Sequence, residues 1–195
     1  MKLLTALLLA LASLGASAQG PAIRTAGVDH VGLNVPDLAQ AEAFLARTFG
    51  CVALTHIGPF KLEGSLSPDR SHAVAARADS VSIAMLRCGH GANLELFEYR
   101  NSTGSTQVPS AEDLGASHIA FYTDDVQAGI AALKSQGLRV LGEPITMPSG
   151  DTAGETWVHF LSPWGAEMEL VGYPAGKGYE KTTRARLWSP RHPAR

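Results

Sequence analysis

The chain has 195 residues with a formal net charge of −2 at pH 7, and 45% of its residues are hydrophobic. This composition is that of an ordinary globular protein, long enough to bury a substantial core. Charge is unevenly distributed, because residues 19–176 carry 9 Lys/Arg against 17 Asp/Glu, whereas residues 177–195 carry 6 against 1. We expect residues 174–195 to be a loosely ordered basic tail rather than an arm that docks on an acidic surface. Apart from this tail, nothing favours nucleic-acid binding.

Residues 1–18 have the features of a secretory signal peptide. Lys2 precedes an apolar run that ends near Leu14, and the small residues Ala16-Ser17-Ala18 follow. A membrane-spanning helix needs about 20 apolar residues, and this run is shorter. We therefore expect cleavage after Ala18, export to the periplasm or the exterior, and no membrane association after the signal is removed.

Two cysteines occur, Cys51 and Cys88. An exported chain can join them in a disulfide, and two buried free thiols are equally compatible with the sequence. The sequence alone does not place them within reach of each other.

An internal repeat relates two segments that begin at His30 and His118. The first reads HVGLNVPDLAQAEAFLARTFG and the second reads HIAFYTDDVQAGIAALKSQG. Alternating apolar residues predict a strand at the start of each copy. Asp37 and Asp125 then stand where an N-cap is needed, and apolar spacings of three and four residues predict a helix after each of them. We expect these helices over residues 37–48 and 125–136.

A second pair of related segments, 94–99 (LELFEY) and 168–173 (MELVGY), predicts a final strand in each half. The spacing between the copies shrinks because the first half carries a longer insertion, roughly residues 57–79, which could cover a site. The remaining strands are expected at 51–57, 80–88, 138–145 and 156–162. Each half then runs strand, helix, strand, strand, strand, which predicts an α+β domain of two modules, 27–99 and 115–173, joined by a linker at 100–114.

Four residues occupy matching positions in the two halves. His30 and His118 lie on the strand face opposite the large apolar residues, and Glu95 and Glu169 each lie between two apolar neighbours. A buried carboxylate needs a partner, because an isolated buried charge costs several kcal/mol. We expect these four residues to bind one divalent metal ion (Zn, Ni, Co, Mn or Fe), with positions left open for water or substrate.

The segments DHVGLNVPDL, NLELFEY, SHIAFYTDDV and HFLSPWGAEMELVGY resemble the vicinal oxygen chelate superfamily. Its members include glyoxalase I, methylmalonyl-CoA epimerase, extradiol dioxygenases and bleomycin resistance proteins. The resemblance covers about residues 27–173. It implies two βαβββ modules curved around a central metal-containing cavity, with metal ligands at His30, Glu95, His118 and Glu169.

The chemistry that follows from this resemblance is a proton-transfer reaction. A metal that chelates two adjacent oxygens stabilises the negative charge formed when a neighbouring C–H proton leaves. A ligand carboxylate, Glu169 or Glu95, can then serve as the general base. We expect a lyase or isomerase of the glyoxalase or epimerase type that acts on a small molecule with vicinal oxygens, and a homodimer is compatible with the sequence.

Two alternatives stay open. An Fe(II) extradiol dioxygenase uses two histidines and one carboxylate, and Glu95 as a fourth ligand argues against it. A non-catalytic, drug-sequestering protein is the other alternative, although such binders generally lack the metal ligands.

Three further polar residues lie near the predicted ligands but are not assigned to the metal site. His159 lies on the strand before Glu169 and could point into the cavity as a proton carrier, but we expect it to be structural. We expect Glu98 and Glu167 to face solvent, since Glu98 has the wrong parity for the site and Glu167 lies at the edge of its strand.

Overall fold

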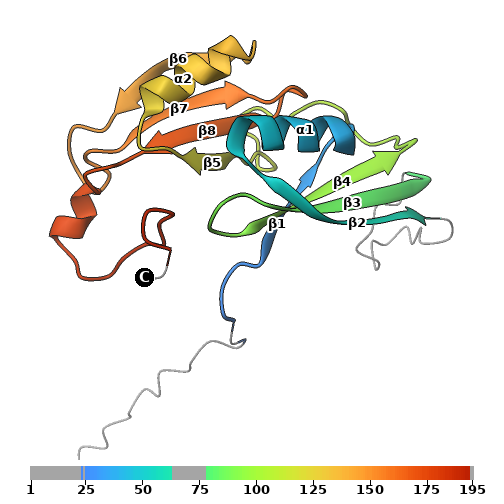
Figure 1. Ribbon diagram of the computed structural model, residues 1–195, viewed down its shortest axis with the longest axis horizontal. Helices are drawn as coiled ribbons and strands as arrows, with labels where there is room; N and C mark the ends of the chain where they lie inside the picture. Colours follow the sequence, from blue (N-terminus) through green and yellow to red (C-terminus); the bar gives the residue numbers. More distant parts are fainter. Residues whose placement is uncertain (1–22, 24, 63–77, 194–195) are drawn as a thin grey trace, which may run out of the picture.

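The computed structural model describes residues 23, 25–62 and 78–193. It contains two four-stranded sheets, with strand orders β1-β4-β3-β2 and β5-β8-β7-β6 (Figure 1). Each sheet pairs its first and last strands in parallel and its other strands antiparallel. The predicted α+β fold of two βαβββ modules is confirmed.

The helices and strands lie close to the predicted ranges. The first module consists of β1 (His30–Asn34), α1 (Leu38–Phe49), β2 (Val52–Lys61), β3 (Ser80–Arg87) and β4 (Asn93–Arg100). The second consists of β5 (Ile119–Tyr122), α2 (Val126–Ser135), β6 (Val140–Thr146), β7 (Thr156–Leu161) and β8 (Glu167–Gly172). β2 runs further than predicted, to Lys61, so the first part of the expected insertion is strand.

Both helices begin at the predicted caps. The backbone N–H of Gln40 donates to Asp37 at 2.8 Å, and that of Ala128 donates to Asp125 at 2.9 Å. α1 ends at Gly50, whose φ of 68° lies in the left-handed region that favours glycine. Local sequence therefore fixes where each helix starts, before any packing contributes.

Helix α1 joins the two modules. On its inner face, Phe44 makes an edge contact with Trp164, with ring centroids 5.6 Å apart, and Phe49 stacks on Phe121 at 3.8 Å. A single cluster of buried apolar residues includes side chains from both helices and both sheets. The modules consequently share one core rather than folding around two.

Glu98 is buried and does not face solvent, so the prediction for this residue is wrong. Only 7% of its side chain is exposed, and it accepts a hydrogen bond from the backbone N–H of Leu38 at 2.9 Å. The exposed Arg100 contacts its other oxygen at 2.5 Å. The parity assigned to Glu98 is correct, but its face of β4 is the one that α1 covers, and its carboxylate binds the first turn of that helix.

We expect Glu98→Ala to lower the free energy of unfolding by about 1–3 kcal/mol, because it leaves a buried helix N–H without a partner. Glu98→Gln retains one acceptor oxygen and should lose less. Urea denaturation of the two variants measures the difference, and an alanine variant as stable as wild type would contradict this role.

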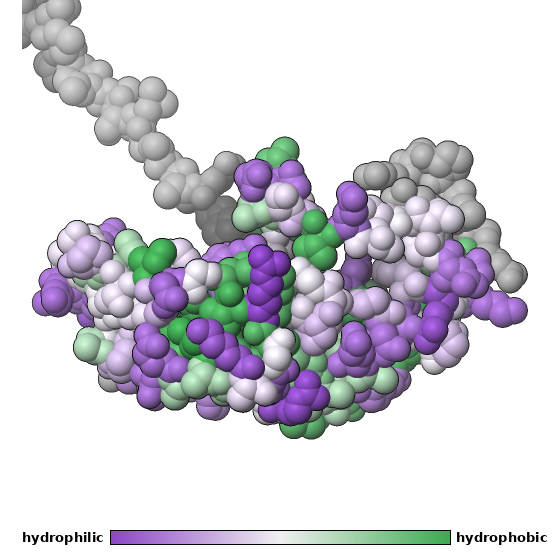
Figure 2. All heavy atoms as spheres, turned by 90° about the horizontal axis from the view of Figure 1, so that it is seen from above, coloured by the Kyte–Doolittle hydropathy of each residue, from purple (hydrophilic) through white to green (hydrophobic). Residues whose placement is uncertain are grey.

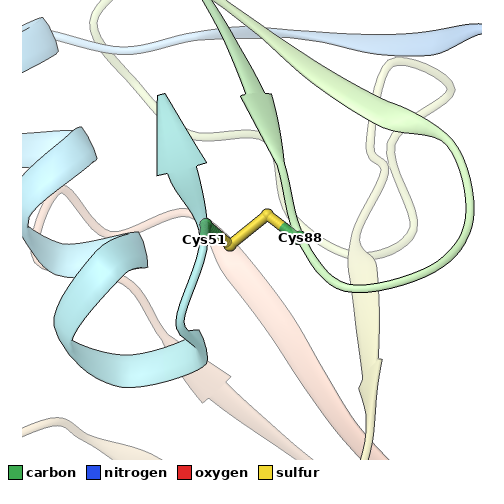
Figure 3. The surroundings of a disulfide bond; sticks show 2 residues. All are labelled: Cys51 and Cys88. Carbon is green, nitrogen blue, oxygen red and sulfur yellow. A yellow bond between two sulfur atoms is a disulfide. The ribbon is translucent and has the colours of Figure 1, made fainter. Parts of the chain in front are cut away.

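Cys51 and Cys88 form a disulfide (Figure 3). They flank the ends of β2 and β3, where Val52 pairs with Arg87. Of the two alternatives left open by the sequence, a disulfide or two buried free thiols, the structure has the disulfide.

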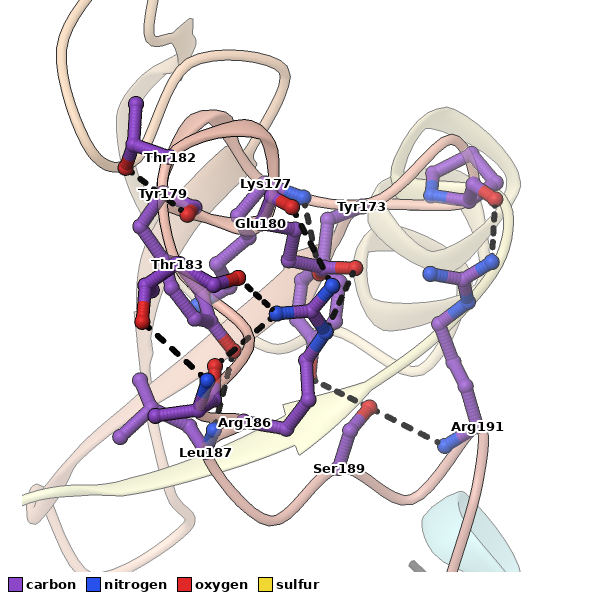
Figure 4. A network of polar contacts seen from close by, with 12 residues as sticks. Tyr173, Lys177, Tyr179, Glu180, Thr182, Thr183, Arg186, Leu187, Ser189 and Arg191 are labelled. Atoms are coloured by element: carbon purple, nitrogen blue, oxygen red, sulfur yellow. Dashed lines mark hydrogen bonds and ion pairs between the residues drawn. The ribbon is translucent and has the colours of Figure 1, made fainter.

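The C-terminal tail is hydrogen-bonded to the body, which the expectation of a loosely ordered segment did not foresee (Figure 4). It includes a short 3-10 helix, Gly178–Lys181. The hydroxyl groups of Tyr173 and Ser189 lie 3.0 Å apart. Lys177 forms an ion pair with Glu155 of the second module. This ion pair is the kind of contact expected of an arm that docks on an acidic surface, which is the alternative that the sequence did not favour.

Among the described residues, no helix has the length and apolar character needed to cross a membrane. The predicted signal peptide, 1–18, lies outside the described residues, as does most of the predicted insertion.

Candidate functional site

The first His–Glu pair lies at the start of β1. His30 Nε2 is 3.0 Å from Glu95 Oε2, and its Nδ1 is 2.8 Å from Asp29 Oδ1. The parallel register of β1 and β4 pairs Gly32 with Glu95, so His30 lies diagonally across from Glu95 on the neighbouring strand. The imidazole is thus held between two carboxylates.

These carboxylates raise the pKa of His30 above its ordinary value of 6.5, chiefly through the hydrogen bond to Asp29. We expect Asp29→Asn to lower the pKa of His30 in the metal-free protein, because the amide carries no charge to stabilise the imidazolium. An NMR titration of the His30 ring protons measures it. An unchanged or higher value would show that Asp29 does not set the pKa.

The second pair lies at the corresponding place in the other module. His118 directly precedes β5, and its Nε2 is 2.9 Å from Glu169 Oε2. Ala120 is paired with Glu169 in the sheet, as Gly32 is with Glu95. The duplication seen in the sequence therefore extends to the side-chain contacts.

A third potential donor, His159, lies beside this second pair. It is paired with Glu169 across β7 and β8, and its Nε2 is 3.7 Å from Glu169 Oε2. Its Nδ1 contacts Glu167, whose side chain is only 25% exposed. The expectation that Glu167 faces solvent is therefore wrong, whereas the structural role expected of His159 stays a prediction.

The structure thus places the four predicted residues as two separate pairs, one in each module. Within the described part of the chain, the group of metal-donor residues found within 4.8 Å of one another is His118, His159 and Glu169. His30 and Glu95 are in contact with each other but do not join that group. A single centre formed by all four residues stays a prediction.

Aromatic side chains border both pairs. Phe97 and Tyr99 stack on the same face of β4 as Glu95, with ring centroids 6.1 Å apart. Burial and the nearby Glu95 charge raise the pKa of Tyr99. The Trp157 ring lies 5.2 Å from that of His159. A substrate bound at either pair would therefore meet apolar rings beside the charged groups.

A cavity of about 620 Å³ lies between the modules. Its lining includes Val31 of β1, residues 119–123 along β5, Phe49 of α1 and Trp188 of the tail. β1 and β5 are both edge strands, so the unpaired edges of the two sheets border the same space. Figure 2 shows one face of the molecule, on which a hydrophobic green area lies among purple and white surface. The predicted donor residues do not line this cavity, and a central metal-containing cavity stays a prediction.

The group formed by His118, His159 and Glu169 has the chemistry needed to bind a divalent metal ion. Imidazole nitrogen and carboxylate oxygen are ligands for first-row metals, which they bind at about 2.0–2.2 Å. Two donors held at that distance lie roughly 2.8–3.6 Å apart for bond angles between 90° and 109°. The distance of 2.9 Å from Glu169 to His118 lies in this range, and that of 3.7 Å to His159 lies just above it.

Two βαβββ modules, each with a His–Glu pair on the sheet face opposite the core, define a duplicated βαβββ protein with two matching candidate sites. The chain belongs to the Glyoxalase/Bleomycin resistance protein/Dioxygenase superfamily, whose profile matches residues 29–154. A 2-epi-5-epi-valiolone epimerase from Actinomyces sp is 40% identical over 167 residues, which cover 84% of this chain and 88% of the relative. The resemblance and the epimerase-like enzyme predicted from the sequence are confirmed, while lyase activity and metal dependence stay predictions.

Solved structures show the same fold. A glyoxalase family protein from Bacillus cereus has a TM-score of 0.61 at 16% identity, covering 79% of this chain and 98% of its own. The trypanothione-dependent glyoxalase I of Leishmania major has a TM-score of 0.54 at 19% identity, covering 81% and 93%. At these identities, the likeness concerns the fold alone.

Proposed function

We propose that this protein is a divalent-metal-dependent epimerase that removes and returns a proton at a carbon next to a carbonyl group. The observation that carries the proposal is the 40% identity with an epimerase over most of both chains. The His–Glu pairs supply the metal donors and acid–base groups that such a reaction needs. Because the relative acts on 2-epi-5-epi-valiolone, that compound is the first substrate to test.

The residues divide into metal ligands and proton carriers. A divalent ion held at the histidines and Glu169 would polarise a chelated carbonyl group. Epimerisation requires that a proton leave one face of a carbon and return to the other. Glu95 contacts only one histidine, so it is the better candidate for the base that removes the proton.

The test is exchange with solvent. The metal-loaded protein is incubated with 2-epi-5-epi-valiolone in D₂O, and the product is examined by NMR. We expect the epimer to form with deuterium at the inverted carbon. Substrate that stays unlabelled and unconverted with every metal tried would refute epimerase activity on this compound.

One observation favours a second candidate, an Fe(II) extradiol-type dioxygenase. His118, His159 and Glu169 provide two imidazoles and one carboxylate, the ligand set typical of non-haem iron oxygenases. Oxygen uptake by the iron-loaded protein with catechol tests it. Ring cleavage with iron and no deuterium exchange with other metals would replace the epimerase proposal.

We also propose that the mature protein is exported. The signal-like residues 1–18 support this, as does the disulfide, since disulfides persist mainly in oxidising compartments. Mass spectrometry of the protein from a periplasmic or secreted fraction should find Gln19 at the N-terminus. Uncleaved protein confined to the cytoplasm would contradict export.

A further inference from the structure

We propose that His159 is a metal ligand of the second module, positioned by Glu167. This inference rests on the metal dependence proposed above, and it concerns a residue outside the four ligand positions expected from sequence.

The contacts of His159 suit ligation. Its Nε2 lies near Glu169, and its ring centroid is 4.9 Å from that of His118. Its Nδ1 is occupied by Glu167, which leaves Nε2 as the nitrogen available for a metal. Metal-binding histidines usually donate their other N–H to a carboxylate or carbonyl group, which fixes the ring orientation and tautomer.

The burial of the group also supports ligation. The exposed fractions of the His159, Glu167 and Glu169 side chains are 24%, 25% and 14%. Glu167 and Glu169 contact the two nitrogens of the same imidazole, and two partly buried carboxylates repel each other unless positive charge lies between them. A divalent cation held at Glu169, with Glu167 bound to the imidazole, would supply that charge.

The first module provides an internal comparison. The residue opposite Glu95 on the neighbouring strand is Met85, whereas the residue opposite Glu169 is His159. The position that Glu167 occupies in β8 is held by Asn93 in β4, two residues before the respective glutamates. At these two sheet positions the first module therefore has neither a third donor nor a carboxylate to orient one, while the second has both. The orienting carboxylate of the first module is Asp29, which contacts Nδ1 of His30.

Metal affinity of the protein with an intact disulfide tests this difference. Apo protein is titrated calorimetrically with Ni²⁺ and with Zn²⁺. We expect His159→Met, which copies the first module, to weaken binding at least about 10-fold, and Glu167→Gln to weaken it about 10–100-fold, as for other residues that orient a ligand. Met85→Ala is the matched control and should bind within about twofold of wild type, since its thioether is only a weak acceptor.

A spectroscopic measurement separates ligation from a merely structural effect. The visible bands of bound Co²⁺ report its ligands, so His159→Met should change them, and Glu167→Asp should restore more of the wild-type spectrum than Glu167→Gln. Wild-type affinity and spectra in both His159→Met and Glu167→Gln would overturn the inference. Wild-type protein that binds neither metal would instead refute the proposed metal dependence. Metal bound normally without epimerisation would refute only the epimerase activity.

Discussion

Glu95→Gln is expected to lower kcat/KM for epimerisation by about 10²–10⁴-fold while bound metal stays within about twofold of wild type. Glu169→Gln is expected to lower both. The difference follows from the contacts, because Glu169 touches two histidines and Glu95 touches one. A glutamine at either position keeps the shape of the side chain but cannot accept a proton from carbon at neutral pH.

Steady-state kinetics and metal analysis of the same protein samples measure the two effects together. Glu143→Gln serves as the control, because this exposed carboxylate on β6 lies outside both His–Glu pairs. It should leave the kinetics and the metal content unchanged. If Glu95→Gln loses the metal as completely as Glu169→Gln, both carboxylates are ligands of one centre, as the sequence first suggested.

Most of the fold could be predicted because its signals are local. The caps at Asp37 and Asp125, the apolar spacing of the helices and the alternation in the strands each depend on a few neighbouring residues. The repeat supplied the long-range information, since a module that appears twice must fold the same way twice. The sequence therefore predicted two βαβββ modules without any knowledge of strand pairing.

The errors concern what covers each strand face. Parity correctly placed Glu98 opposite Glu95, but parity does not say that α1 lies over that face. The residue was assigned to solvent although its carboxylate binds the helix that covers it.

The contact between His159 and Glu169 was not predicted, for a related reason. A strand face becomes a site only when the neighbouring strand is in register, and register depends on the turn. The sequence Pro163-Trp164-Gly165 is typical of a tight turn, and His159 and Glu169 lie five residues away on either side of Trp164. Counting outward from that turn would have predicted their contact, which the structure shows.

The pairing of Cys51 with Cys88 could not be found by such counting. The two residues lie just beyond the ends of β2 and β3, but the insertion between those strands hides the turn from which register is counted. Only the folded sheet shows that they are neighbours, with Cα atoms 4.2 Å apart.

We expect that removal of this disulfide with Cys51→Ala/Cys88→Ala will lower the free energy of unfolding by about 3–4 kcal/mol. The bond spans 37 residues of sequence, and a closed loop of that length restricts the unfolded chain strongly. Alanine is the appropriate replacement because Cys51 is buried, and a serine would add the cost of an unpaired hydroxyl group.

Urea denaturation with and without a phosphine reductant separates the bond from the side chains. Wild type should lose most of the 3–4 kcal/mol when it is reduced, while the double variant should be insensitive to the reductant. Equal stability of oxidised and reduced wild type would show that the packing of β2 and β3 holds this edge without the bond. Because the Cys88 end of β3 continues into residues that line the cavity between the modules, reduction should also loosen that wall. Hydrogen exchange at Gly89 and Gly91 should then rise with reductant in wild type and not in the double variant.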